Sequence, residues 1–480
     1  MIAQEYRYAK VASVPRLDQV TADALIEQFE HAWELEETLM SSLAGESTFY
    51  INPDPLRNPL IFYLGHSAVF YINKLIRVGL LDRRINPDYE VLFEIGVDPS
   101  TPEELAEAIQ SIQWPGVEKV WRYRDQARET IAAAIRRASQ VLPIHQQHPL
   151  WAFLMGIEHS RIHFETSSML IRQYPLNHVQ RPASWAYAPA EVNRPTTAQN
   201  SHNMVYIPGG VVDLGKPQDA VTYGWDIDYG HRQVEVQPFW VSPFLITNQD
   251  FLDFVDADGY ANPDYWSAPA WEWVQHYQVK HPKFWRSPHT SPDTSPHGSG
   301  SKASKDVANS ASYRYRAMFD EIDLPLSWPA EVNHYEAMAF CRWKGDGSRL
   351  LTEAEWNQAL AIYGSRNAVD GYNIDYRWGS PCPVGWVEQS PHSDSIKTDY
   401  VYDLRGNVWE WLGDPFAPLP GFQPHYLYED YSQPFFDNQH YLMVGGSWAS
   451  TGSYASAQCR NWFRPYFHQH VGFRIARDVA

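Results

Sequence analysis

The sequence has 480 residues, which is more than one ordinary domain holds, so two or three domains are expected. Asp and Glu outnumber Lys and Arg by 57 to 38, and a chain with a formal net charge of −19 should repel nucleic acid and anionic membranes. We therefore expect neither as a partner. Hydrophobic residues make up 44% of the chain, which is enough for buried cores.

The cysteines and the N-terminus bear on the compartment. Cys341, Cys382 and Cys459 are far apart and odd in number, which argues against a disulfide framework or a C-x-x-C metal site. The first residues contain no apolar core of a signal peptide, and no run approaches the roughly 20 apolar residues that span a bilayer. We expect a soluble protein in a reducing cytoplasm.

Residues 1–175 have the pattern of a helical domain. Apolar residues recur at helical spacing, and Thr21 is a plausible N-cap for the first helix. Four long amphipathic helices predict a four-helix bundle, a fold that builds metal sites from side chains on facing helices. The predicted helices include residues 21–43, 59–81, 117–142 and 155–173.

The last of these helices carries the most informative pattern. His159 and His163 are four residues apart, so they share one helix face and can bind one metal ion together. Imidazole suits Fe, Zn, Cu and Ni, so the spacing does not name the metal, and a solvated face without metal is the alternative. Glu165 faces another part of the helix surface, which favours a substrate or supporting contact over a third ligand.

The composition changes after the helical domain. Residues 176–200, rich in Pro, Ala, Asn and Thr, are predicted to be a linker. Residues 201–480 predict an α+β domain, in which strand-like segments alternate with Gly/Pro turns and short helices. Residues 287–312 are polar and of low complexity, which predicts a flexible surface loop. The strand-like segments are 204–215, 232–247, 441–450 and 470–478, and the helices are 248–259, 331–345 and 352–364.

Several motifs resemble known domains. Residues 64–73 (LGHSAVFYIN) and 156–166 (GIEHSRIHFET) resemble a DinB-like bundle with a His…His-x3-His-x-Glu signature. Residues 405–411 (RGNVWEW) and 471–478 (VGFRIARD) resemble the formylglycine-generating-enzyme domain, which has a C-type-lectin-like scaffold. The two domains in this order are similar to the thiohistidine sulfoxide synthases, the non-haem iron enzymes of ergothioneine and ovothiol biosynthesis.

The resemblance implies a metal centre. Its members bind Fe(II) with three histidines, which correspond here to His66, His159 and His163. This arrangement leaves open positions for the substrate imidazole, the thiolate and O2, and it brings the reactants to one centre. Taken alone, His66 would be read as a core histidine of an apolar helix.

The resemblance also implies two catalytic-site tyrosines. In residues 420–432 (PGFQPHYLYEDYS), Tyr428 corresponds to the proton or redox donor of the ergothioneine enzymes, and Tyr431 to a residue of the imidazole site. A phenol is a reasonable acid for proton delivery at the metal. The alternative is that these rings only pack, in a chain with 15% aromatic residues, and Tyr426 is a nearby competitor.

A third motif concerns the substrates. Asn461 and Trp462 correspond to residues that line the pocket of the trimethylated amino group, and an aromatic face suits a quaternary ammonium. Either Arg464 or Arg460 is a candidate to hold a substrate carboxylate.

The same motif bears on the sulfur donor. Phe463 and Phe467 stand where the enzyme that uses γ-glutamylcysteine has Asp and Arg, which favours free cysteine as the sulfur donor.

Two signals disagree on the acceptor. Residues 49–66, 155–173 and 214–230 look like the ovothiol-type enzyme, which joins cysteine to histidine. That type usually carries a C-terminal methyltransferase domain, which is not expected here, and Tyr431 with Asn461 and Trp462 looks like the ergothioneine pocket. We expect hercynine plus cysteine, with histidine plus cysteine as the alternative.

Two other function classes remain as alternatives. Formylglycine-generating enzymes use a paired-cysteine copper site, but the cysteines here do not fall in the matching motif. A non-catalytic, lectin-like binding protein is the remoter alternative, because fold does not fix function.

Overall fold

The structure is a computed structural model that describes residues 14–94, 101–138, 141–191, 204–287, 313–364, 372–386 and 399–479. All but the first residue of the predicted loop at 287–312 lies outside these described residues, as do residues 192–200 of the predicted linker. None of the helices within the described ranges is long and apolar enough to cross a bilayer.

The N-terminal part is a four-helix bundle, which confirms the prediction. Thr21 caps the first helix, since its hydroxyl oxygen accepts a hydrogen bond from the Ala24 amide at 3.1 Å. Two short helices in the connections, α3 (Pro87–Leu92) and α4 (Pro102–Ile109), were not expected from the sequence. The bundle helices are α1 (Ala22–Met40), α2 (Leu60–Arg77), α5 (Val117–Arg137) and α6 (Trp151–Gln173).

The second part is an α+β domain of small sheets and short helices, also as predicted. Its sheets have the strand orders β1-β4-β12, β10-β9-β8-β11, β2-β3 and β5-β6-β7. The helices are α7 (Asn248–Asp256), α8 (Ala268–Tyr277), α9 (His334–Lys344) and α10 (Glu353–Tyr363). The strands are β1 (Val205–Ile207), β2 (Gly210–Leu214), β3 (Arg232–Val236), β4 (Phe239–Val241), β5 (Trp285–Arg286), β6 (Arg314–Arg316), β7 (Glu321–Asp323), β8 (Trp409–Pro415), β9 (Tyr441–Val444), β10 (Asn461–Phe463), β11 (Val471–Gly472) and β12 (Ala476–Asp478).

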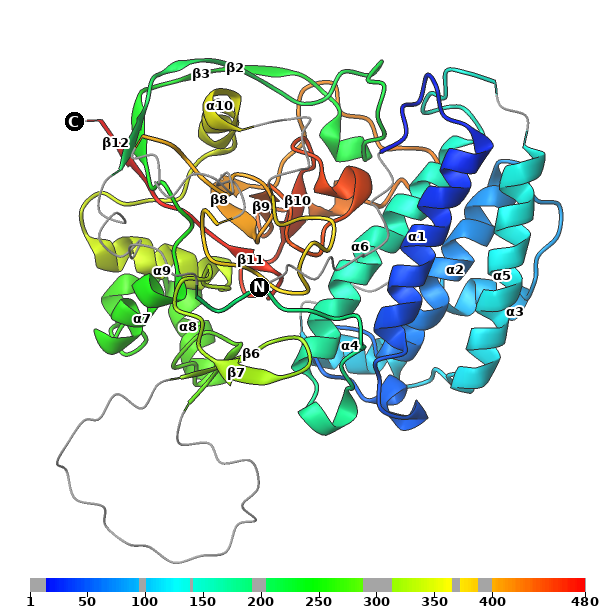
Figure 1. Ribbon diagram of the computed structural model, residues 1–480, viewed down its shortest axis with the longest axis horizontal. Helices are drawn as coiled ribbons and strands as arrows, with labels where there is room; N and C mark the ends of the chain where they lie inside the picture. Colours follow the sequence, from blue (N-terminus) through cyan, green and yellow to red (C-terminus); the bar gives the residue numbers. More distant parts are fainter. Residues whose placement is uncertain are drawn as a thin grey trace, which may run out of the picture.

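Helix α6 lies between the other bundle helices and the second domain (Figure 1). Nearly all of its side chains are buried, because one face packs on α1 and α2 and the other meets the second domain. Polar residues on this second face form hydrogen bonds across the boundary. The Glu158 carboxylate accepts from the Ser453 and Tyr454 amides, and Ser168 lies 2.8 Å from His470 Nε2. The boundary is therefore bridged by specific polar contacts.

Helices α2 and α6 approach closely at Gly156. A Cβ atom added there would lie 2.2 Å from Cδ1 of Tyr71, and the Tyr71 ring is held by an edge-to-face contact with Phe29. The absence of a side chain at Gly156 thus sets the distance between the two helices that carry the histidines.

We predict that Gly156→Ala lowers the free energy of unfolding by about 1–3 kcal/mol, because overpacking outweighs the gain of about 1 kcal/mol in helix propensity. Urea denaturation measures this change. Gly116→Ala is the control, since a Cβ atom there meets nothing within 4 Å. A Gly156→Ala protein as stable as the wild type would contradict the proposed close packing.

Candidate metal centre

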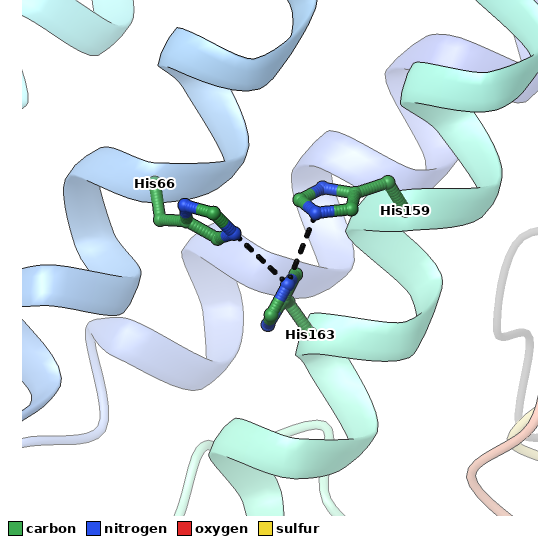
Figure 2. Close-up of side chains that lie close together, drawn as sticks. All are labelled: His66, His159 and His163. Atoms are coloured by element: carbon green, nitrogen blue, oxygen red, sulfur yellow. Dashed lines mark hydrogen bonds between the residues drawn. The ribbon is translucent and has the colours of Figure 1, made fainter. Parts of the chain in front are cut away.

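Three imidazoles from two facing helices converge inside the bundle. His66 comes from α2, and His159 and His163 come from α6 (Figure 2). The Nε2 atoms of His66 and His159 each lie 3.1 Å from Nε2 of His163, and all three ligand atoms lie within 4.8 Å of one another. Among the described residues, this is the one group of three or more His, Cys, Asp or Glu side chains placed to hold an ion.

Neighbouring groups fix the orientation of two of the rings. His66 Nδ1 donates to the Phe93 carbonyl oxygen at 2.6 Å, which leaves the lone pair of His66 on Nε2, toward the other histidines. Phe70 stacks on His159 with ring centroids 3.5 Å apart and planes 7° apart. Phe62 stacks on His66 at 4.7 Å. The rings of His66 and His159 are therefore held in place by the apoprotein.

The three imidazoles are neutral at ordinary pH. Burial lowers the pKa of His66 to about 4, and it lowers the pKa values of His159 and His163 well below the usual value, helped by the other histidines. Neutral imidazole is the form that binds a metal. A set of three nitrogen ligands suits Fe(II), Zn, Cu or Ni and not Ca or Mg, which require oxygen ligands. The residues present thus fit an Fe(II) ion.

The second domain contributes aromatic rings beside the histidines. The Tyr428 ring centroid lies 6.1 Å from that of His159 and 5.3 Å from that of Tyr431. Tyr431 stacks on Trp225 at 4.2 Å and meets Trp462 at 5.1 Å with planes 78° apart. We call Tyr428, Tyr431, Trp225 and Trp462 the aromatic wall. Three separate segments of the second domain build it.

The Tyr428 phenol stays protonated. Burial raises its pKa above the usual value, and the nearby Asp430 and Asp226 carboxylates raise it further. The ammonium of Lys74, on α2, lies over the ring faces of both Phe70 and Tyr428, 4.7 and 4.9 Å from their centroids. A buried cation on the ring face fixes Tyr428 relative to the bundle.

Glu165 faces the second domain. Its Oε1 atom accepts hydrogen bonds from Trp409 Nε1 and Ser447 Oγ, both at 2.7 Å, and its Oε2 atom accepts one from Ser450 Oγ at 3.1 Å. Burial raises the pKa of Glu165 to about 7. These contacts connect the helix turn that carries His163 to β8 and the loop after β9.

The remaining predicted substrate residues differ in their surroundings. Asn461 Nδ2 donates to the Tyr454 hydroxyl at 2.6 Å, next to Trp462 of the aromatic wall. The Arg460 guanidinium binds Glu353 through Nε at 2.6 Å and Nη2 at 3.0 Å, which directs it into the second domain. Arg464 is also buried, and its Nη1 donates to Gln439 at 3.2 Å.

Several neighbours of the cluster were missed by sequence reasoning. Phe70 and Lys74 follow His66 at four and eight residues, so helical spacing could have placed them on the same face of α2. Trp225 and Asp226 lie at the start of a short 3-10 helix (Asp226–Asp228), and no local pattern connects them to the histidines. Asp226 is buried, Ser432 donates to its Oδ1 at 2.9 Å, and its Oδ2 has no hydrogen-bond partner within the described ranges.

Comparison with known families defines the class of both domains. Residues 28–167 match the DinB superfamily, and residues 189–479, more than half of the chain, match the sulfatase-modifying factor enzyme 1-like domain. The chain joins a DinB domain that carries the histidines to a domain that carries the aromatic wall. It belongs to the family of proteins with a sulfatase-modifying factor enzyme 1-like domain.

Individual relatives extend the likeness over both domains. Hercynine oxygenase of Mycolicibacterium smegmatis is 27% identical over 94% of this chain and 98% of its own length. Hercynine oxygenase of Mycobacterium tuberculosis is 31% identical over 51% of this chain and 54% of its own length. Ergothioneine biosynthesis protein 1 of Neurospora crassa is 23% identical over 97% of this chain, which spans 59% of that longer protein.

We predict that the protein binds one equivalent of Fe(II) under anaerobic conditions. His159→Ala and His163→Ala should each weaken binding by about 100-fold or more, since loss of a mere supporting partner already costs 10- to 100-fold. An iron titration followed by equilibrium dialysis measures this. His276→Ala, an exposed histidine on α8, should bind iron like the wild type. Equal iron binding by all three variants would rule out the cluster as the metal site.

Proposed function

We propose that this protein is a non-haem, Fe(II)- and O2-dependent sulfoxide synthase that joins the thiol of cysteine to the imidazole of hercynine. The observation that carries the proposal is the convergence of three neutral imidazoles, from His66, His159 and His163, beside the Tyr428 phenol of the other domain. The two hercynine oxygenases and the ergothioneine biosynthesis protein support the substrate class.

The proposed reaction balances without any further redox partner. Hercynine, cysteine and one O2 give hercynylcysteine sulfoxide and one water. Carbon–sulfur bond formation removes two electrons and two protons from a C–H and an S–H bond, and sulfur oxidation removes two more electrons. O2 accepts all four electrons, so one oxygen atom ends in the sulfoxide and the other in water.

Different residues of this chain have different roles in the proposed reaction. When bound by the three histidines, Fe(II) supplies open coordination positions and the redox capacity for O2 chemistry. Tyr428 holds a proton at its hydroxyl beside the centre, because its pKa is raised. His163 is the partly exposed member of the cluster, which leaves its side accessible to substrates.

The aromatic wall supports hercynine as the acceptor. Tyr431 and Trp462 meet nearly at right angles and form an aromatic corner, which suits the trimethylammonium group of hercynine. The Asp226 carboxyl group lies beside this wall, and burial raises its pKa to about 7, so it supplies a negative charge to the same group once it has lost its proton. Asp226 Oδ2 has no hydrogen-bond partner within the described ranges, so this oxygen can face the cationic group of either acceptor.

Histidine is the second candidate, and the same Asp226 oxygen favours it. The primary ammonium of histidine can donate a hydrogen bond to Oδ2, whereas trimethylammonium cannot. A competition assay with Fe(II), O2, cysteine and equal hercynine and histidine separates the two by mass spectrometry of the products. Hercynylcysteine sulfoxide should dominate. A histidylcysteine sulfoxide product would establish the ovothiol-type reaction, and no sulfoxide at all would refute the proposed function.

We predict that Tyr428→Phe shifts the products toward cysteine sulfinic acid, because the variant lacks the proton or electron that suppresses simple oxygenation of cysteine. Product ratios from chromatography and mass spectrometry measure the shift. Tyr426→Phe is the control, since that ring lies beside His425 at 4.9 Å. An unchanged ratio in Tyr428→Phe would remove Tyr428 from this role.

A further inference from the structure

Arg57 lies in the connection that leads into α2, and its guanidinium packs on two rings of the second domain. The guanidinium carbon is 5.1 Å from the centroid of Phe463 and 4.7 Å from that of Phe467. These two rings lie 6.2 Å apart with planes 52° apart. A guanidinium held against aromatic faces presents its N–H donors at its edge, and one of these donors interacts with Tyr63. Arg57 is thus positioned by packing across the boundary between the domains.

Tyr63 connects Arg57 to the histidine cluster. The Tyr63 ring centroid lies 5.7 Å from that of His163. Burial raises the pKa of the Tyr63 phenol, and the charge of the adjacent Arg57, together with a side-chain hydrogen bond from it, opposes this rise. The same charge contributes, after burial and His66, to the low pKa of His163. Arg57 is therefore the cation on the His163 side of the cluster, as Lys74 is on the His159 side.

Arg57 differs from most of the deeply buried arginines in that its charge has no ion-pair partner within the described residues. Within the described residues, no carboxylate oxygen lies within the 4.0 Å of an ion pair from its guanidinium, although the side chain is half-buried. Five buried arginines each pair with a carboxylate, whereas buried Arg316 donates to backbone carbonyl oxygens. The five pairs are Arg124–Glu36, Arg161–Glu158, Arg172–Glu331, Arg460–Glu353 and Arg474–Glu410. A half-buried cation beside a reaction centre, without a protein carboxylate, is suited to an anionic group of a ligand.

A cavity lies beside this arginine. Its volume is about 370 Å³, and its lining includes Leu56, next to Arg57 in sequence, and Phe467, on which the guanidinium packs. This volume lies within the range of small-molecule sites. Arg57 is not itself among the lining residues, and Leu56 and Phe467 connect it to the cavity wall.

We propose that Arg57 binds the α-carboxylate of the sulfur donor and so selects a small amino-acid thiol. This inference rests on the proposed function. Because Phe463 and Phe467 cover the faces of the guanidinium, the carboxylate binds along its edge, where two parallel N–H donors match its two oxygens. The carboxylate held in this way orients the thiol toward the side of the cluster that His163 leaves accessible.

Binding of three thiols distinguishes a contact between Arg57 and a carboxylate from a general effect of the substitution on the site. Cysteine has a carboxylate and an amine, 3-mercaptopropionate lacks the amine, and cysteamine lacks the carboxylate. Anaerobic calorimetric titration of the Fe(II)-loaded protein measures each dissociation constant. Arg57→Met should weaken binding of cysteine and 3-mercaptopropionate by about 10- to 100-fold, the loss of a charge-assisted contact, and change cysteamine by less than about 2-fold. Arg57→Lys should restore part of the loss.

Kinetics and controls complete the test. The KM for cysteine should rise in Arg57→Met, while the KM for hercynine stays within about 2-fold, because the acceptor lies against the aromatic wall. Arg83→Met, at an exposed arginine, should match the wild type in every titration. Iron stoichiometry of Arg57→Met shows that the variant keeps its metal centre.

The outcomes separate this inference from the proposed function. Equal weakening of all three thiols, no weakening of any, or no binding of cysteine by the wild type would overturn the role of Arg57. A raised KM for hercynine alone would assign Arg57 to the acceptor and overturn it too. Wild-type protein that binds cysteine but forms no sulfoxide would refute the proposed function, while the titrations would still decide the role of Arg57.

Discussion

The candidate site depends on how α6 docks on the second domain. The histidines come from the bundle, and the aromatic wall comes from the other domain, so neither part holds a complete site. Glu158 and Glu165 of α6 each accept several hydrogen bonds from the second domain. A buried carboxyl group that loses its hydrogen-bond partners costs about 1–3 kcal/mol, so these two residues oppose any other arrangement of the domains.

A second buried network fixes the far end of α6. Arg172 pairs with Glu331 at 2.8 Å, and His470 lies between Glu331 and Ser168. Burial alone would raise the pKa of Glu331, but the Arg172 charge and the hydrogen bonds of His470 and Tyr315 lower it to about 2. Exposed ion pairs are worth at most about 1 kcal/mol, so these buried contacts, not the acidic surface, determine the docking geometry. One face of α6 therefore carries the histidine cluster, and the other holds the two domains together.

Sequence reasoning succeeded where the signal was local. The spacing of His159 and His163 placed both rings on one helix face, and the amphipathic pattern gave the bundle helices. It failed where position depends on packing between distant segments. Strand β8 was missed because its buried residues run Trp409 to Leu412 without alternation, and its Glu410 is neutralised by Arg474 from another segment. A strand buried on both faces does not show the period of two that identifies half-exposed strands.

The same contrast holds within the site. The expected substrate residues were named from motifs, and the motifs could not show that Arg460 binds Glu353 or that Glu165 reaches Trp409. Arg57 and Asp226 lie in segments that resemble the ovothiol-type enzyme, but nothing in the sequence singled out either residue. The structure places each near the histidines or the aromatic wall, without an ion-pair partner within the described ranges. Whether such a charge has an ion-pair partner is known only when its neighbours in the three-dimensional structure are known.

The central claim is that one iron ion is held by three imidazoles of the bundle and faces a phenol of the other domain. Anomalous diffraction at the iron absorption edge, from anaerobic crystals of the Fe(II)-loaded protein, locates the metal directly. The account predicts a single strong peak in contact with the Nε2 atoms of His66, His159 and His163, on the side that faces Tyr428. A peak at any other set of residues, or none at these three nitrogens, would contradict it.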